Sequence, residues 1–579
     1  MTQNRSPQPG LTFLGKLISL LLIIGVIAVG GWVYLRMQSP APTAVATPDQ
    51  TVTPGENVTP VAPVDANLPA PQELVETMST VPMLAGALAY VPTDNTVLME
   101  LSEYAGYAGL IAANGGLEPT ENSVFFRKGG FKLKIVLSEE ESWGKLNSGQ
   151  MGVSATTADV LAVYGRQFSV VVPAQIGFSR GADGIVVTNN IRRINDLKGQ
   201  TLVTAQFTET EFFIRYLAQE AGLKVTTLED LSSPRDPEAV NLIFASDAFS
   251  AGDLFVREVN ACSTRVAGVA TLDPRTTEVV EETAGKTRVL TTNRNLLIIA
   301  DVMIVNKGFA QANPDKVAAL VNGLLEGNRM VRDTPDAYLD VIGKAFKWDR
   351  AKTQRELTKV HLSNLPESLA FFSGAIDAAG SFSGIYNNAV LAYGPGLISN
   401  PVDADRFVDL QHLRALETTG VYKDQKIAIA PIGGGGGTSL LEGNPLLSKD
   451  VRFTFVPNSP QLDLDSADNL KALETARDLL KVSPGSVLLI RGHVDDALVA
   501  KFRQEGGEQM VRTMGLRALD LSKQRAAEVQ RVLIEKYQAP KDRLEVVGRG
   551  WEEPVGADPD PDRRSAQNRR VEVQWFTVE

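Results

Sequence analysis

The chain opens with an apolar run at Leu17–Leu35 that contains no charged residue. This length is about that of a helix crossing the hydrocarbon core of a bilayer. Trp32 and Tyr34 stand at its far end, where amphipathic rings favour the membrane interface, and Arg5 and Lys16 precede it. The pattern predicts one transmembrane helix whose short N-terminal tail stays in the cytoplasm.

We expect this anchor at residues 17–36, after a cytoplasmic tail at residues 1–16. A cleaved signal peptide is the alternative, because Ala28-Val29-Gly30 fits a small-x-small cleavage pattern. No cysteine lies near the run, which excludes a lipid-attached terminus. We expect a linker and lead-in at residues 37–90: residues 38–72 are dense in Pro, Ala, Thr and Val and predict an extended linker, and residues 73–90 a short lead-in.

Between about Val91 and Leu416, short apolar runs alternate with segments of helical spacing. This alternation predicts βαβ units and parallel sheets. The expected strands are residues 131–137, 185–188, 201–205 and 297–305. The expected helices are residues 101–116, a helix start within 152–163, and residues 208–216, which open with a Thr-x-x-Glu capping box.

Five glycines, Gly433–Gly437, mark a second break, and we expect a linker at residues 417–449. The pattern of the remaining residues, 450–579, predicts an α+β domain in the order βαβαββ. Its expected strands are residues 451–456, 486–490, 543–547 and 570–576, and its expected helices are residues 467–480 and 519–537.

Composition narrows the possible functions. The 579 residues exceed one ordinary core, and 44% apolar and 22% charged residues are typical of globular domains. A net charge of -11 without a basic tract argues against a nucleic-acid partner. One cysteine and three scattered histidines offer no Cys/His metal site and no nucleophilic triad. We therefore expect a protein that is not an enzyme and that has no metal or cofactor.

The central region resembles the type II periplasmic solute-binding proteins of the nitrate, sulfonate and thiamine-precursor branch. The segments that carry the resemblance are SGQMGVSATTADV at 148–160, FSRGADGIVV at 178–187 and NDLKGQTLVTAQFTETEFFIRYLAQEAGL at 195–223. The resemblance implies a two-lobed α/β fold over residues 91–416. Lobe I would take residues 91–185 and 300–400, lobe II residues 186–299, and the hinges would lie near 184–188 and 297–301.

Such folds bind an anion between helix N-termini, where free N–H groups and the helix dipole favour negative charge. The resemblance therefore implies a small anionic or amino-sulfonate-like solute. A plain helix cap is the alternative role for each hydroxyl, and a turn anchor is the alternative for the aspartate. The candidate solute-binding residues are Ser154, Thr156, Thr157, Asp183, Thr208 and Thr210.

The terminal region resembles the OmpA-like domains that bind peptidoglycan, on the segments GHVD at 492–495, LSKQRAAEV at 521–529 and NRRVEV at 568–573. The resemblance implies that an Asp and an Arg hold the diaminopimelate of the stem peptide. These fall on Asp495 and Arg525, with Arg569 and Arg570 bracing the pocket. Two features depart from the family: Ala518 replaces an Asn, and the stretch between the Asp and the Arg is longer.

These features together predict a single-pass inner-membrane protein that displays a solute-binding domain in the periplasm and is tied to peptidoglycan. A ligand sensor or envelope scaffold for a small anionic solute fits this arrangement best. Two alternatives stay open. One is the substrate-binding component of an ABC-type uptake system, with a transporter permease as partner. The other is a purely structural membrane-to-wall linker without a ligand.

Overall fold

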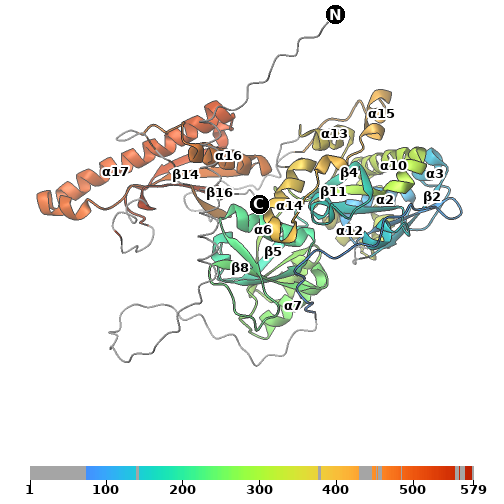
Figure 1. The fold of residues 1–579 in the computed structure, drawn as a ribbon, viewed down its shortest axis with the longest axis horizontal. Coiled ribbons are helices and arrows are strands. Elements are labelled where there is room, and N and C mark those ends of the chain that lie inside the picture. The colour runs from blue at the N-terminus through green and yellow to red at the C-terminus, as the bar shows by residue number, and fades with distance from the viewer. Residues whose placement is uncertain are drawn as a thin grey trace, which may run out of the picture. The chain divides into compact units, whose positions relative to one another are not determined.

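The computed structural model describes residues 73–138, 143–375, 380–429, 446–451, 453, 455, 460–483, 485–554, 560 and 567–576. The predicted anchor, most of the predicted linker and the glycine run lie outside these residues. No helix in the described part of the chain is long and apolar enough to cross a membrane. The described elements form three sheets, two in the central region and one in the terminal domain (Figure 1).

Lobe I is built on a six-stranded sheet of order β12-β4-β11-β3-β1-β2. In this sheet β1 runs parallel to β2 and β3, whereas β11 lies antiparallel between β3 and β4. The strands are β1 (Thr96–Leu101), β2 (Lys132–Leu137), β3 (Val153–Thr157), β4 (Val170–Ser179), β11 (Ala300–Asn306) and β12 (Val360–Leu362).

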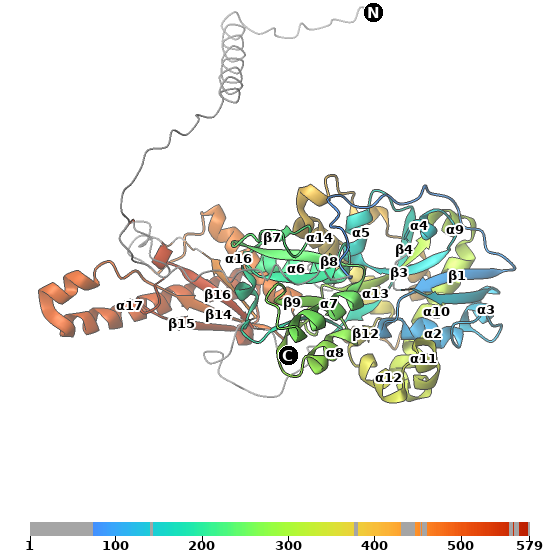
Figure 2. The ribbon, with the colours of Figure 1, turned by 90° about the horizontal axis from the view of Figure 1, so that it is seen from below.

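Helices cover both faces of this sheet. Met303 and Val305 of β11 belong to one buried cluster, and Val302 and Ile304 belong to another, as the alternation of a strand requires. Figure 2 shows α5 on one side of the sheet and α2 and α10 on the other. The helices are η1 (Ala105–Tyr107), α2 (Ala108–Asn114), α3 (Val124–Gly129), α4 (Trp143–Asn147), α5 (Ala158–Tyr164), α9 (Lys307–Ala312), α10 (Pro314–Asp333), η3 (Pro335–Ala337), α11 (Leu339–Phe346), α12 (Arg350–Leu357), α13 (Leu365–Ser373), α14 (Phe382–Leu397), η4 (Ala404–Arg406) and α15 (Gln411–Thr419).

Lobe II has a second six-stranded sheet, of order β10-β5-β9-β6-β8-β7. Val186 and Val203 pack with α7 and α8 on one face, and Ile185 and Leu202 pack with α6 on the other. The strands are β5 (Asp183–Thr188), β6 (Thr201–Ala205), β7 (Lys224–Thr227), β8 (Ala239–Ala245), β9 (Gly268–Leu272) and β10 (Thr287–Thr292). The helices are η2 (Ile194–Leu197), α6 (Glu209–Glu220), α7 (Ala248–Asn260) and α8 (Arg275–Glu282).

The chain crosses between the lobes twice, from β4 to β5 and from β10 to β11. The second crossing falls close to the expected hinge. The first lies at residues 180–182 rather than at 184–188, because those later residues are already paired inside the sheet of lobe II. The Asn293 side-chain oxygen ties the two crossings together by accepting from the amides of Gly181 (2.8 Å) and Asp183 (3.2 Å).

Two helix starts differ from the prediction. Ser154 and Thr156 belong to β3, which is wholly buried between β1 and β11, and the helix begins only at Ala158. The expected capping box at α6 does not form, because the Thr208 hydroxyl donates to the Ala205 carbonyl at 3.0 Å instead of capping the helix. Buried β-branched residues favour a strand, which overrides the helix-start signal.

The terminal domain has the predicted order of elements and a four-stranded sheet of order β13-β16-β14-β15. Its first strand starts at Leu447 rather than Val451, so the prediction was displaced toward the C-terminus. The elements are β13 (Leu447–Val451), α16 (Ala467–Val482), β14 (Val487–Gly492), α17 (Val499–Tyr537), η5 (Lys541–Arg543), β15 (Leu544–Gly548) and β16 (Val571–Phe576).

The long helix α17 contains the extra sequence that precedes Arg525. Prediction placed its start at Leu519, but the helix begins at Val499 and breaks once at Gly507, whose φ of 63° suits glycine. Further along, α17 packs tightly on β14. A Cβ atom on Gly492 would lie 1.9 Å from the Ser522 carbonyl oxygen, so the close approach requires a glycine there.

Candidate functional site

A small cavity of about 40 Å³ lies between the two lobes, roughly the volume of one or two water molecules. Residues from both sheets and from the second crossing line it, together with the loop after β1. Its polar and aromatic lining includes Tyr104, Thr157, Ser179, Asp183, Glu209 and Asp301.

A second cavity, of about 250 Å³, shares Ser102, Glu209 and Leu272 with the first. It is richer in rings, and its lining includes Trp143, Tyr164, Phe207, Thr208, Asp247 and Phe249. The two adjoining cavities are called the cleft below. One end of the cleft is narrow and acidic, and the other end is wider and aromatic.

Asp301 and Thr157 stand side by side in the narrow end, because β11 pairs Asp301 with Thr157 of β3. Asp301 is 3% exposed, and its Oδ1 accepts a hydrogen bond of 3.1 Å from the Tyr107 hydroxyl. Within the described part of the chain, Asp301 Oδ2 and Thr157 Oγ1 have no hydrogen-bond partner. Their nearest polar neighbours are the Tyr104 hydroxyl for Asp301 and the Asp159 carboxyl group for Thr157, which interact with them without forming a well-aligned hydrogen bond.

Asp183 fastens the crossing and lines the cavity at the same time. Its Oδ2 accepts from the Ser179 hydroxyl at 2.5 Å and from the Asn293 amide nitrogen at 3.0 Å. The carboxyl group is 4% exposed, and burial raises its pKa well above the ordinary value, with the charge of Glu209 adding to the effect. Asp183 therefore fills both of the roles considered for it: it anchors the turn at the crossing, and it lines the candidate site.

Two further carboxyl groups are affected in the same way. Burial raises the pKa of Asp159 and of Asp301 to about 8, and the charge of Glu209 contributes to both shifts. Asp159 lies in the first turn of α5, directly after Thr157 and Ala158. Near neutral pH, Asp183 and Asp301 in the cleft and the neighbouring Asp159 therefore tend to hold their protons.

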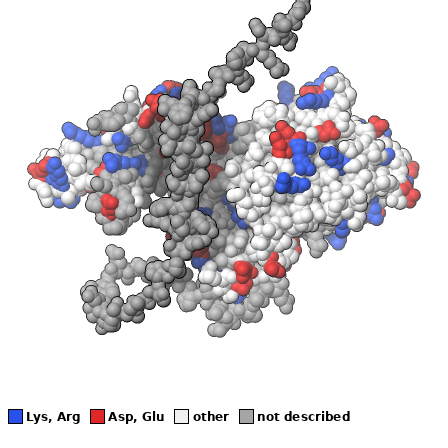
Figure 3. Space-filling model, viewed as in Figure 1, with Lys and Arg blue, Asp and Glu red and all other residues white. Residues whose placement is uncertain are grey.

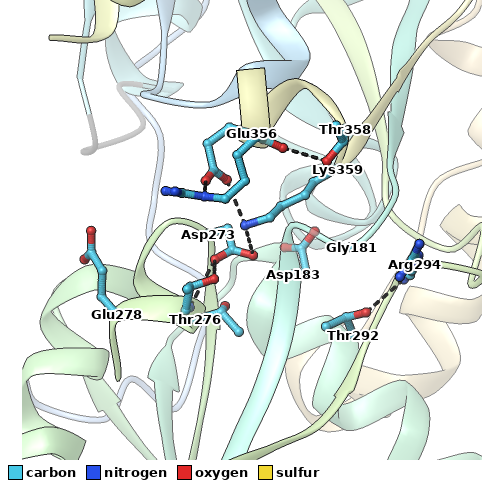
Figure 4. Close-up of polar contacts among 12 residues, drawn as sticks. Gly181, Asp183, Asp273, Thr276, Glu278, Thr292, Arg294, Glu356, Thr358 and Lys359 are labelled. Carbon is cyan, nitrogen blue, oxygen red and sulfur yellow. Dashed lines mark hydrogen bonds and ion pairs between the residues drawn. The ribbon is translucent and has the colours of Figure 1, made fainter. Parts of the chain in front are cut away.

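An ion-pair cluster joins the lobes beside the crossings (Figure 4). Lys359, which follows α12, lies 2.8 Å from Asp273 of lobe II and 3.0 Å from Glu356 of lobe I. The lysine side chain is 18% exposed and both carboxylates are almost fully buried. Lys352 reaches Glu278 of lobe II at 3.6 Å, in a more exposed position. The positive charge of Lys359 is thus already neutralised by its neighbours.

The structure brings three of the six predicted solute-binding residues into the cleft: Thr157, Asp183 and Thr208. The other three are not among the lining residues. The Ser154 hydroxyl donates to the Glu100 carbonyl at 3.1 Å, Thr210 shares its hydroxyl with Thr204 at 2.8 Å, and Thr156 pairs with Val302 rather than with Asp301.

Sequence reasoning missed the acids and tyrosines of the narrow end. The residues missed are Tyr104, Tyr107, Glu209 and Asp301. One signal was available, since Asp301 is the lone charge within the apolar run at 297–305. A charged side chain entering a buried strand is seldom placed there for stability alone.

The charge of the cleft disagrees with the anion that the resemblance implied. Among the described residues that line its two cavities, none is Lys, Arg or His. On the outer face drawn in Figure 3, by contrast, basic and acidic side chains lie interspersed. A buried anion beside Asp183 and Asp301 would meet unfavourable charge or would need both acids to stay protonated.

The terminal domain brings together three of its four predicted residues. Arg569 Nε lies 3.5 Å from Asp495 Oδ2, and the Arg525 guanidinium lies 5.0 Å from the ring centroid of Phe455. Arg525 Nε has no hydrogen-bond partner in the described part of this domain. Burial lowers the pKa of Arg525, and the nearby Arg569 adds to this effect. The Asp495 carboxylate and the Arg525 guanidinium are thus both available to a ligand.

Arg570 faces a different set of groups. Its Nη2 lies 3.6 Å from Glu572 Oε2, and its carbonyl accepts a 2.9 Å hydrogen bond from the His493 amide. His493 is 2% exposed, and burial lowers its pKa to about 4, so the ring is neutral at physiological pH. Where the family Asn is replaced by Ala518, the Ser522 hydroxyl accepts from the Gly550 amide at 3.0 Å.

Comparison with known families agrees with both resemblances. The family described as NMT1/THI5 like matches residues 121–338, and the OmpA family matches residues 454–569. Among curated proteins, none matches this sequence. The chain thus combines a type II solute-binding domain of the NMT1/THI5 like kind with a C-terminal OmpA domain. Both domains indicate an envelope location.

Solved structures that resemble the chain have low sequence identity. The periplasmic aliphatic sulphonate binding protein from Escherichia coli is 15% identical, with 54% of this chain and 97% of that chain covered and a TM-score of 0.41. The periplasmic nitrate-binding protein from Synechocystis PCC 6803 is 12% identical, with 57% and 90% covered and a TM-score of 0.42.

Proposed function

We propose that this protein is an envelope receptor whose two-lobed domain binds a small solute while the OmpA domain holds the chain to peptidoglycan. Residues 17–36 would anchor it in the inner membrane, with the N-terminus in the cytoplasm. The observation that carries the proposal is the cleft itself. Its walls come from both lobes, so a bound solute would hold the lobes closed and report occupancy as a change of shape.

The unsatisfied atoms of the cleft favour a receptor over a purely structural linker. A buried polar group without a partner costs about 1–3 kcal/mol. Asp301 Oδ2 and Thr157 Oγ1 are two such atoms, on neighbouring strands and facing the same cavity. A linker gains nothing from this arrangement, whereas a binding site gains two directed contacts with its solute.

The tether favours sensing or scaffolding over delivery to a transporter. A chain fixed to the wall and to the membrane cannot diffuse between many permeases. In the terminal domain, Arg525 would receive the free carboxylate of diaminopimelate and Asp495 its amine. The open Nε of Arg525 and the adjacent Asp495–Arg569 pair support this assignment.

Sedimentation with purified sacculi tests the tether. The full chain in mild detergent should pellet with sacculi, and Arg525→Ala should remain in the supernatant. Arg512→Ala is the matched control, because Arg512 is an exposed arginine of the same helix. Equal pelleting of Arg525→Ala and the control would contradict the assigned wall site.

Native mass spectrometry tests the receptor. The full chain, released from detergent in the instrument, should carry a small molecule of defined mass that leaves on activation. A chain that never carries one, and whose thermal stability no small solute changes, would favour the structural linker.

A further inference from the structure

The cleft combines buried acids at one end with aromatic rings at the other. We infer that its solute is a small organic cation, a protonated or methylated amine with a compact apolar body. This inference rests on the proposed receptor function and adds the chemical class of the solute. It replaces the anion that the sequence resemblance implied.

The narrow end suits an ammonium head group. Its volume of about 40 Å³ admits a group of only a few atoms. Asp301 presents a buried Oδ2 without a partner in the described structure, and Asp183 and Glu209 line the same space. An ammonium group would donate to these oxygens, and its charge would compensate theirs in a medium of low dielectric constant.

Two tyrosine rings line the same narrow end of the cleft. The Tyr104 and Tyr107 rings pack edge to face with centroids 5.2 Å apart, and both line the narrow end. The Tyr107 hydroxyl orients Asp301 through its 3.1 Å hydrogen bond. Tyrosine faces attract organic cations, including those whose methyl groups prevent hydrogen bonding. The narrow end therefore suits a protonated amine, and a bulkier methylated head group would take the adjoining wider end beside Glu209 and its rings.

The wide end supplies room for the apolar body of the solute. Trp143, Phe207 and Phe249 line a space of about 250 Å³ that continues from Glu209. A solute with its head group at Asp301 would extend over these rings and lose its contact with water. Rings in place of further oxygen ligands favour an organic cation over a metal ion, which requires a shell of oxygens.

Binding should also release protons, because the empty site holds several acids in their neutral form near pH 7.5. An entering cation favours the ionised form of each carboxyl it touches. The titratable groups that influence one another here come from lobe I and lobe II. They are Tyr104, Tyr107, Asp159, Asp183, Glu209 and Asp301.

Calorimetric titration of the full chain in detergent tests the inference. The probes are choline, tetramethylammonium and propylammonium chlorides, against sodium nitrate, sodium sulfate and sodium ethanesulfonate at equal ionic strength. At least one cation should bind and release protons, detected as heats that depend on the ionisation enthalpy of the buffer. Asp301→Asn should weaken that binding at least tenfold, and Glu281→Gln, an exposed carboxyl on α8, should leave it unchanged.

Each outcome of the titration decides whether the solute is a cation. Binding of an anion probe alone, or retention of full cation affinity by Asp301→Asn, overturns the inference but leaves the receptor function in place. A co-purifying molecule that proves to be an anion has the same effect. Absence of binding by all six probes also overturns the cation assignment. The receptor function then depends on the native mass spectrum.

Discussion

Asp301 illustrates how one side chain links stability to function. It occupies the second position of a buried strand, it is 3% exposed, and only one of its two oxygens has a partner in the described structure. Burial of such a carboxyl group costs free energy unless it is protonated or meets a cation. Its presence therefore lowers the stability of the domain, and under the proposed function it raises the affinity for a cationic solute.

The pKa of Asp301 predicts a pH dependence of stability. Its ordinary value is 3.8 and burial raises it to about 8, so between these values the folded chain binds the additional proton. The unfolding free energy should therefore fall as pH rises from about 4 to 8. Asp301→Asn should reduce this slope by up to about 1.4 kcal/mol per pH unit.

Hydrogen exchange of the β11 amides, corrected for intrinsic rates and followed from pH 5 to 8, measures how the unfolding free energy of the solute-binding domain changes with pH. Asp159, Asp183 and Glu209 remain in the variant, so part of the dependence should persist. Identical slopes in the wild type and in Asp301→Asn would contradict the assigned burial.

At this scale the sequence predicted the hydroxyls better than the acids. Thr157 and Thr208 stand directly before helices, so a short-range sequence pattern was enough to find them. Glu209 and Asp301 lie far apart in the chain and meet only because the second crossing returns β11 to lobe I beside β3. That proximity is tertiary, and no local pattern contains it.

At the scale of elements, the ion pairs across the lobes determine how readily the cleft opens. Lys359→Met would leave Asp273 buried without its cation, whereas Glu356 would keep Arg355 at 3.0 Å, and loss of one partner of a buried pair costs about 3–5 kcal/mol. Partial exposure of Lys359 places the expected loss near the lower end of this range. Thermal unfolding of the full chain measures it.

Two further variants make this prediction specific. Lys352→Met should change the stability by less than about 1 kcal/mol, because its partner Glu278 is well exposed. Adding Asp273→Asn to Lys359→Met should recover part of the loss, since one uncompensated charge is then removed. Equal losses for Lys352→Met and Lys359→Met would refute the special role of the buried cluster.

The contact between α17 and β14 gives a second prediction at this scale. Gly492→Ala would place a methyl group 1.9 Å from the Ser522 carbonyl oxygen, so the helix must move outward. The terminal domain should lose about 1–3 kcal/mol of stability. Gly396→Ala, where nothing lies within 4 Å, is the control and should cost little. A Gly492→Ala variant as stable as this control would show that the helix does not pack so closely.

Periodicity predicted the elements but not all of their ends. The order βαβαββ of the terminal domain was correct, because its strands and helices have clear periods. The start of α17 was missed because Gly506 and Gly507 are typical of a loop, whereas the structure absorbs them in a single break. The strand β3 was missed because its threonines imitate a helix cap.

At the scale of the whole molecule, two domains of different families share one chain. The fold classes were predictable, since each domain carries its own sequence signature. The charge of the solute was not predictable, because it depends on which side chains the two lobes place opposite one another. The resemblance implied an anion, whereas the acids and rings that line the cleft are the basis of the proposed cation.

The most direct test of the account asks whether one chain binds wall and solute at the same time. Sacculi loaded with the full chain are pelleted, washed and extracted with acid, and the extract is examined by mass spectrometry. The account predicts one small organic cation per chain, absent with Asp301→Asn although that variant pellets normally. Loaded sacculi that release no cation, or that release an equal amount with Asp301→Asn, would contradict it.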